Sequence, residues 1–266
     1  VAVGQGAMEG VASGVALEGA IAIGKDALTA ITSTDAGGTI GIGYQAGDAI
    51  TTGRYNVAVG YSAFGTSAEQ DYNTAVGYNA LTAMSGSAGE GKNTAIGSWA
   101  GYGNTTATYN TAIGSHALYS TTTSGTNVGV GANAAYSFTG NDSVWVGANV
   151  GYNAAAAAST VAVGYYAGRY LIGSNSVLVG KNAGYYATGS YNTFIGTDTG
   201  KGGTTSAPYS SGENNTAMGY GALKSFTTGD DNVAVGQDSG DALATGQKNV
   251  FIGKSAGTGT TDVDNA

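Results

Sequence analysis

The sequence contains few side chains whose types and spacing would permit catalysis or metal binding. Its 266 residues include one histidine, His116, and no cysteine. Transition-metal sites and Ser-His-Asp triads draw on these residue types, so both are improbable here. His116 stands where comparable segments have Asn79, Ser62 or Asp26, and this variability predicts a surface residue. We therefore expect no catalytic residue, no cofactor, no metal site and no enzyme activity.

The acidic residues show no repeated pairing, and the calcium-binding signature G-G-x-G-x-D is absent. Asp262 and Asp264 near the end of the chain predict a solvated tail more readily than a weak calcium site. The phrase Gly41-Ile42-Gly43 resembles a nucleotide-binding loop but lacks the lysine-serine pair of a P-loop. None of these patterns predicts a defined ligand site.

Tyrosine is the abundant residue type that offers binding chemistry, with eighteen copies. Exposed tyrosines stack on sugar rings and anchor protein contacts, but they also simply fill strand surfaces. The sequence leaves these two interpretations equally open. The candidates for surface recognition are Tyr165, Tyr166, Tyr185, Tyr186 and Tyr209.

The composition excludes several classes of protein. The net charge is −8 and only nine residues are Lys or Arg, so no basic stripe exists for a nucleic-acid backbone. No apolar run approaches the roughly 18 residues that a membrane helix needs, so we expect no membrane insertion. Hydrophobic residues make up 42% of the chain and recur at fixed positions, which argues against disorder.

The organising feature is a recurring phrase, Asn-(Thr/Val)-Ala-(Val/Ile)-Gly, at a period of mostly 16 or 17 residues. A fixed short period is typical of stacked identical units rather than of a globular enzyme. We expect one all-β domain over residues 1–266, a β-roll or β-solenoid of about fifteen repeats of 16–20 residues. Residues 1–30 predict tighter turns with a spacing of ten, and residues 198–214 predict an inserted loop. The fifteen repeat glycines are Gly4, Gly24, Gly43, Gly60, Gly77, Gly97, Gly114, Gly131, Gly147, Gly164, Gly180, Gly196, Gly219, Gly236 and Gly253.

Positions are numbered here from the repeat glycine. Positions −3 and −1 are Val, Ile, Thr or Met, which predicts a short strand with this face toward the core. Val59→Asp is then expected to unfold the solenoid. Position +3 is small and usually Ala, which predicts a second short strand across a narrow interior. Position −2 is expected to face outward, and the large residues there predict a subunit interface rather than scattered surface hydrophobics. These interface candidates are Trp145, Leu178, Phe194 and Phe251.

Position −4 is Asn in nine repeats. Asn side chains stacked at about 4.8 Å can hydrogen-bond to one another and to turn backbone groups, so we expect a structural ladder. The repeat glycine predicts a positive φ or a close backbone approach at a corner. The ladder residues are Asn56, Asn73, Asn93, Asn110, Asn127, Asn192, Asn215, Asn232 and Asn249.

The phrases that begin at Asn73, Asn-Thr-Ala-Val-Gly-Tyr-Asn-Ala-Leu, and at Asn192, Asn-Thr-Phe-Ile-Gly, resemble repeats of bacteriophage tail fibres. Val1-Ala2-Val3-Gly4 and the phrase at Asn56 also resemble the head repeats of trimeric autotransporter adhesins of the YadA type. The resemblance covers nearly the whole chain. It implies a homotrimeric rod on an extracellular fibre that touches a cell surface. The period of 16–17 residues is longer than in the adhesins, and no coiled-coil stalk is present.

We therefore expect a structural and adhesive fibre domain, on a virion surface or otherwise extracellular, most like a phage tail-fibre segment that attaches to a host. Its expected partners are copies of itself and a glycan or protein receptor on a cell. The alternative is a self-assembling extracellular filament, or a bacterial adhesin or matrix protein, whose subunits join end to end or through strand edges. An ice-binding solenoid is less favoured because position −3 mixes Thr with Val.

Overall fold

The computed structural model describes residues 1–11, 17–32, 36–66, 69–85, 89–203 and 210–265. Within these ranges the chain is all-β, without a helix, and winds as a parallel β-solenoid of about 14 turns of about 17 residues. The predicted fold class is confirmed. The chain divides into two compact units, residues 1–133 and residues 134–266.

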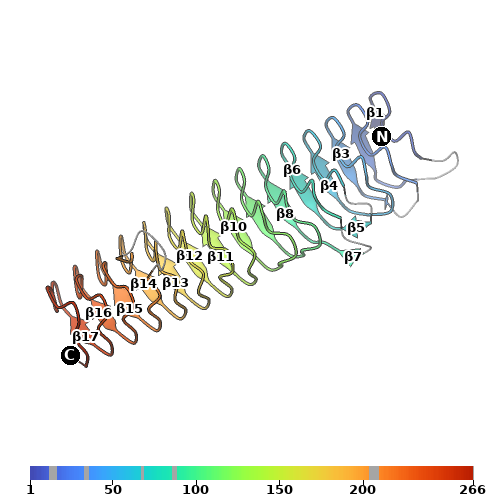
Figure 1. Ribbon diagram of the computed structural model, residues 1–266. Coiled ribbons are helices and arrows are strands. Elements are labelled where there is room, and N and C mark those ends of the chain that lie inside the picture. The colour runs from blue at the N-terminus through green and yellow to red at the C-terminus, as the bar shows by residue number, and fades with distance from the viewer. Residues whose placement is uncertain (12–16, 33–35, 67–68, 86–88, 204–209, 266) are drawn as a thin grey trace. The chain divides into compact units, whose positions relative to one another are not determined.

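In the first unit, each repeat contributes one short strand that pairs in parallel with the strand one turn further along. A separate two-stranded sheet joins the loops of two turns (Figure 1). The repeat strands are β1 (Ala2–Val3), β2 (Ile21–Ile23), β3 (Ile40–Ile42), β4 (Val57–Val59), β6 (Thr74–Val76), β8 (Thr94–Ile96), β9 (Thr111–Ile113) and β10 (Val128–Val130), and the small sheet contains β5 (Gln70–Asp71) and β7 (Gly89–Glu90).

The second unit repeats the same construction with seven consecutive parallel strands. These are β11 (Val144–Val146), β12 (Val161–Val163), β13 (Val177–Val179), β14 (Thr193–Ile195), β15 (Thr216–Met218), β16 (Val233–Val235) and β17 (Val250–Ile252). The strands thus lie at all fifteen predicted positions. The long step between β14 and β15 holds the expected insertion, of which residues 204–209 lie outside the described residues.

The turn at the start of the chain differs from the prediction of a ten-residue spacing in residues 1–30. Ala2 pairs directly with Ala22, and Val3 with Ile23. One turn therefore spans 20 residues here. Because β1 pairs directly with β2, no further strand of the sheet lies between them.

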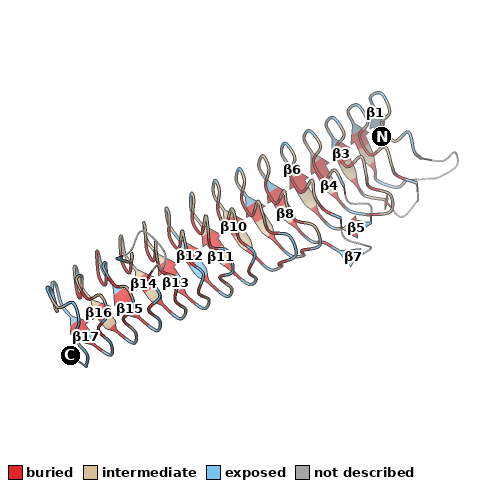
Figure 2. Cartoon of the chain, in the orientation of Figure 1, coloured by how far each residue is buried: buried red, intermediate tan, exposed pale blue. Residues whose placement is uncertain are grey.

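The direction in which the strands face is the reverse of the prediction. In each three-residue strand the central residue, at −2, is buried, while −3 and −1 are half-buried or exposed (Figure 2). Val163 and Ile96 at −1 are 36% and 41% exposed, whereas Ala162 and Ala95 at −2 are fully buried. Val59 is likewise half-exposed and Ala58 is buried, so within a single chain an aspartate at position 59 would remain hydrated.

The four predicted interface residues consequently lie inside their own chain. Trp145, Leu178 and Phe194 have no exposed surface, and Phe251 is 8% exposed. The prediction that they form a subunit interface is wrong, because position −2 points into the solenoid. Phe138 packs edge-on against Trp145 with ring centroids 5.3 Å apart, as a core residue does.

The segment after the repeat glycine is a turn and not the predicted second strand. Its residues at +2 and +4 have positive φ, as Asn79 (52°) and Leu81 (50°) illustrate. The side chains at +3 are buried as expected, Ala80 among them, except Ala7 and Ala256 in the first and last repeats. Turn-to-turn backbone hydrogen bonds continue through these corners, for example from the Asn79 N–H to the Tyr61 carbonyl at 3.0 Å.

The repeat glycine is required by the stacking of successive turns. Its φ lies between +122° and +137° in all fifteen copies. At Gly60 an added Cβ would lie 2.5 Å from the carbonyl oxygen of Gly77, and the same contact recurs at the other repeat glycines whose next turn belongs to the same unit. No side chain fits between two backbones at that distance, so the glycine allows the turns to approach closely.

The side chains at −2 and +4 share one interior volume, and their sizes compensate. Where −2 is large, +4 is glycine: an added Cβ at Gly151 would collide with the Trp145 ring, and one at Gly200 with Phe194. Where +4 is large, −2 is Ala. The pairs with a large −2 residue are Trp145/Gly151, Leu178/Gly184, Phe194/Gly200 and Phe251/Gly257, and those with a large +4 residue are Ala2/Met8, Ala22/Leu28, Ala58/Phe64, Ala75/Leu81, Ala112/Leu118 and Ala217/Leu223.

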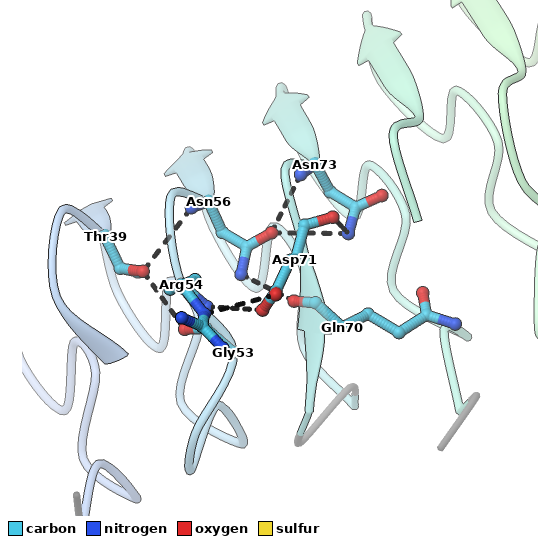
Figure 3. Close-up of polar contacts among 7 residues, drawn as sticks. All are labelled: Thr39, Gly53, Arg54, Asn56, Gln70, Asp71 and Asn73. Atoms are coloured by element: carbon cyan, nitrogen blue, oxygen red, sulfur yellow. Dashed lines mark hydrogen bonds and ion pairs between the residues drawn. The ribbon is translucent and has the colours of Figure 1, made fainter. Parts of the chain in front are cut away.

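The asparagines at −4 form the predicted ladder, and all nine are buried. The Oδ1 of Asn56 accepts the backbone N–H of Asn73 at 2.8 Å, and the Oδ1 of Asn73 accepts that of Asn93 at 3.0 Å. The Nδ2 of Asn56 donates to the Gln70 carbonyl at 2.7 Å (Figure 3). Each amide thus satisfies backbone groups that the narrow coil removes from water.

Hydroxyl side chains perform the same task where asparagine is missing. The Thr39 hydroxyl accepts the Asn56 N–H and donates to the Gly53 carbonyl (Figure 3). In the second unit the hydroxyl of Ser143 accepts the Thr160 N–H at 3.2 Å. The ladder therefore accepts Ser or Thr as well as Asn, and the repeat of Gly24 departs from it with Ala20 at −4.

We predict that Trp145→Ala lowers the free energy of unfolding by about 3–5 kcal/mol through the cavity it leaves. Gly151→Leu alone overpacks the same space and lowers it by roughly 1–3 kcal/mol. The double variant reproduces the Ala75/Leu81 combination, so its loss should be at least about 1 kcal/mol smaller than the sum of the single losses. Urea unfolding of the four proteins measures this coupling. Additive losses would show that the two side chains do not share a volume.

We predict that Asn73→Ala lowers the free energy of unfolding by about 1–3 kcal/mol, because the buried N–H of Asn93 loses its acceptor. Asn73→Ser is the matched control, since a serine hydroxyl accepts this bond in the turn of Ser143. Its loss should be clearly smaller in the same unfolding measurement. Equal losses for the two variants would refute the ladder as a source of stability.

Candidate functional site

Besides the connecting loops, where Tyr55, Tyr72, Tyr109 and Tyr191 are exposed, side chains available for binding lie at two places on each turn. One is the outward strand face, at −3 and −1. The other is the corner after the repeat glycine, where positions +1, +2, +5 and +6 are exposed or half-exposed in most turns. The corner carries the more varied chemistry, and its side chains stack in rows because the turns stack in register.

In the first unit these rows are largely aromatic. Tyr44, Tyr61 and Tyr78 at +1 form a continuous stack, with ring centroids 5.0 and 5.3 Å apart and interplanar angles of 15° and 21°. Tyr78 then meets the ring of Trp99 edge-on at 5.3 Å. Because neighbouring rings cover each other's faces, these tyrosines mainly stabilise the corner.

His116 belongs to this aromatic group and is half-exposed, at the surface as predicted. Its ring lies nearly parallel to that of Trp99, with centroids 6.3 Å apart, and its Nδ1 is 2.9 Å from the Ser115 hydroxyl. Both His116 and Trp99 occupy the left-handed +2 position, with φ of 55° and 61°. These contacts place His116 in the corner packing.

In the second unit the corners after β12, β13 and β14 differ, because tyrosines there are interleaved with basic residues. The side chains come from three successive turns and lie at positions +1, +2, +5 or +6 of each. We call this group the tyrosine–lysine cluster, and it consists of Tyr165, Tyr166, Arg169, Tyr170, Lys181, Asn182, Tyr185, Tyr186, Asp198 and Lys201.

Arg169 lies at the centre of the aromatic side of the cluster. Its Cζ is 4.5 Å from the ring centroid of Tyr166, 5.4 Å from that of Tyr170 and 5.7 Å from that of Tyr185. Its Nε is buried without a hydrogen-bond partner. Contacts of this kind contribute about 0.5–2 kcal/mol each, according to how far the cation is desolvated. The tyrosine rings therefore hold a positive charge that no described carboxylate neutralises.

The hydroxyls of Tyr165 and Tyr166 hydrogen-bond to each other. This bond raises the pKa of Tyr165 and lowers the pKa of Tyr166, and a hydrogen bond from Arg169 lowers the pKa of Tyr166 further. The Tyr166 oxygen is thus the acceptor of the pair. For Tyr185 it is burial that raises the pKa. The ionisation of Tyr165 and Tyr166 is thus linked to the charge of Arg169.

A hollow of about 310 Å³ opens among the side chains of the cluster, lined by Tyr165, Tyr166, Lys181, Asn182, Tyr185, Tyr186 and Lys201. Its volume falls at the lower end of the roughly 300–1,000 Å³ that is typical of small-molecule sites. The Lys201 amine is 3.7 Å from a carboxylate oxygen of Asp198, which also accepts from the Asn182 amide at 2.9 Å. The hollow therefore has aromatic walls and a positively charged rim.

The structure brings together four of the five predicted recognition residues, Tyr165, Tyr166, Tyr185 and Tyr186, around this hollow. Tyr209 lies outside the described residues. Sequence reasoning missed Lys181, Lys201 and Arg169, although aligning the repeats on their glycines places all three at +1 or +5. That alignment was the signal available for finding them.

The described residues contain no group of three or more His, Asp or Glu that could hold a metal ion. They also contain no helix that is long and apolar enough to cross a membrane. Several carboxylates have structural contacts instead. The Asp264 side chain accepts the Gln247 N–H at 2.7 Å, and that of Asp71 accepts the Arg54 N–H at 2.9 Å and pairs with its guanidinium (Figure 3).

Comparisons of the chain with protein-family models, with curated proteins and with solved structures found no match.

Proposed function

We propose that the chain is a structural and adhesive segment of an extracellular fibre, most like a bacteriophage tail fibre. In this proposal, copies of the chain associate as a homotrimer, and the corner side chains contact a glycan or protein on a cell surface. The proposal assigns no catalytic role to any residue. Two observations support it: the phrases of the sequence that resemble fibre repeats, and the apolar outward face of the strands.

That outward face carries the proposal. Positions −3 and −1 are Val, Ile, Thr or Met in all fifteen repeats, without a single charge. Several of these side chains are exposed in the single chain, including Ile113 (38%), Val161 (40%) and Met218 (46%). A soluble monomer rarely leaves an extended apolar patch in water, so these two rows favour burial against a partner.

The most suitable partner is another copy of the same chain. Both rows repeat with every turn, so a second solenoid aligned alongside presents the same apolar side chains at the same spacing. The resemblance to trimeric fibre repeats favours three copies. The interface thus consists of positions −3 and −1, and not of the large residues at −2, which are inside the solenoid.

The alternative is a filament or matrix protein whose subunits join end to end. It relies on pairing between strand edges instead of packing between sheet faces. The two forms of assembly differ in mass, because lateral packing closes at a small number of copies whereas end-to-end pairing does not.

We predict a molar mass near three chains for the native protein, measured by light scattering after gel filtration. Burial of the −3 and −1 rows provides the driving force, at about 25 cal/mol per Å² of apolar surface. A mass of one chain would refute the trimer. A mass that grows with concentration without reaching a plateau would support the filament instead.

We predict that Val163→Asp converts the trimer to folded monomers, because a carboxylate in the apolar interface is left without a partner. Ala162→Asp, on the opposite side of the same strand, should instead abolish folding, since position 162 is fully buried. Thr106→Asp, at an exposed loop position, controls for added charge. Circular dichroism and molar mass distinguish the three outcomes. A Val163→Asp protein that remains trimeric would exclude this face as the interface.

A further inference from the structure

We propose that the hollow of the tyrosine–lysine cluster is a binding site for an acidic saccharide, which it recognises through a carboxylate or sulfate group on the sugar. The inference rests on the proposed attachment role, in which the corners contact a cell surface. It goes further by naming the site and the chemical class of the ligand.

The cluster carries a net positive charge, whereas the whole chain is acidic. The chain has a net charge of −8 and only nine basic residues, of which Arg169, Lys181 and Lys201 lie in the cluster. Among residues +1 to +6 of the five corners that follow Gly147, Gly164, Gly180, Gly196 and Gly219, the only acidic residue is Asp198. Within the described residues neither Arg169 nor Lys181 pairs with a carboxylate. A local surplus of positive charge on an acidic protein favours an anionic ligand.

The arrangement of the tyrosine rings favours a sugar over a bare anion. Neighbouring rings that line the hollow are tilted or perpendicular to each other, unlike the parallel stack of Tyr44, Tyr61 and Tyr78. Tyr186 also stacks at 12° on Tyr170, which does not line the hollow. The angle is 45° between Tyr165 and Tyr166, 84° between Tyr166 and Tyr185 and 74° between Tyr185 and Tyr186. All four of these tyrosines line the hollow, so the carbon skeleton of a sugar can pack against their rings.

The rim supplies the polar partners that a sugar also needs. Lys181 is exposed, and its amine can donate three hydrogen bonds. The Lys201 amine lies 3.7 Å from a carboxylate oxygen of Asp198. The Asp198 and Asn182 side chains are already joined to each other at 2.9 Å, so they form an ordered acceptor and donor for sugar hydroxyls. Aromatic walls with a few convergent polar groups are the usual composition of a small-molecule site.

The test is a calorimetric titration of the full chain with an oligogalacturonate, which carries one carboxylate per ring. Its methyl ester is the neutral counterpart, and an oligosaccharide of a sulfated galactan distinguishes sulfate from carboxylate as the recognised group. We expect saturable binding of at least one acidic oligosaccharide, at least about tenfold tighter than that of the methyl ester.

The decisive variant is Lys181→Gln/Lys201→Gln, which removes both rim amines and keeps the tyrosines. Its Kd for the acidic oligosaccharide should rise at least about tenfold. The matched control is Lys224→Gln/Lys254→Gln, because these lysines occupy the same repeat positions, +5 and +1, outside the hollow. The control changes the net charge equally, and its Kd should stay unchanged. Thermal unfolding confirms that both variants keep the fold.

Three results would overturn the inference: no binding of either acidic oligosaccharide, equal binding of the methyl ester, or equal effects of the two lysine pairs. Its failure is distinguishable from failure of the proposed fibre assembly. A trimer without sugar binding refutes the inference alone, whereas a monomer that binds the acidic sugar through Lys181 and Lys201 refutes the assembly alone.

Discussion

Close contact between the backbones of successive turns is the constraint from which the rest of this structure follows. The repeat glycine allows the contact, because at Gly60 a Cβ would lie 2.5 Å from the Gly77 carbonyl oxygen. With the turns this close, each side chain lies directly against the equivalent side chain of the next turn. The Asn56 amide therefore meets the backbone of Asn73, and the ring of Tyr44 meets that of Tyr61. Ladder, core and aromatic rows all result from the same stacking.

Much of this could be predicted from the sequence, because a strict period reports on stacking directly. The repeat glycines, the strand positions and the amide ladder were all inferred correctly. The facing of the strands was predicted wrongly, because the β-branched face of a strand is usually its buried face and here it is the outward one. A three-residue strand is too short for alternation to settle this. In a narrow coil the inside position is often alanine, since a corner residue such as Leu81 already fills the space.

The sequence nevertheless indicates the correct facing through the side-chain sizes at positions −2 and +4, which are six residues apart. Wherever −2 is large, as at Trp145 or Phe194, +4 is glycine. Such compensation is expected only of side chains that compete for one volume. The cluster around Arg169 was harder to foresee, since its members come from three different turns. Aligning the repeats on their glycines places Arg169, Tyr185 and Lys201 at +5, but only the structure shows that side chains from these three turns meet.

Two kinds of exposed position recur in every repeat outside the connecting loops, and the two differ in character. The outward rows at −3 and −1 are uniform in all fifteen repeats, which suits a contact that is itself periodic, such as the one between identical solenoids. The corners are not uniform: they carry a parallel tyrosine stack in the first unit and interleaved tyrosines and basic residues in the second. A ligand smaller than the solenoid must be recognised where one turn differs from the next. We therefore expect assembly to depend on the strand face and recognition on the corners, so that either can change in sequence without disturbing the other.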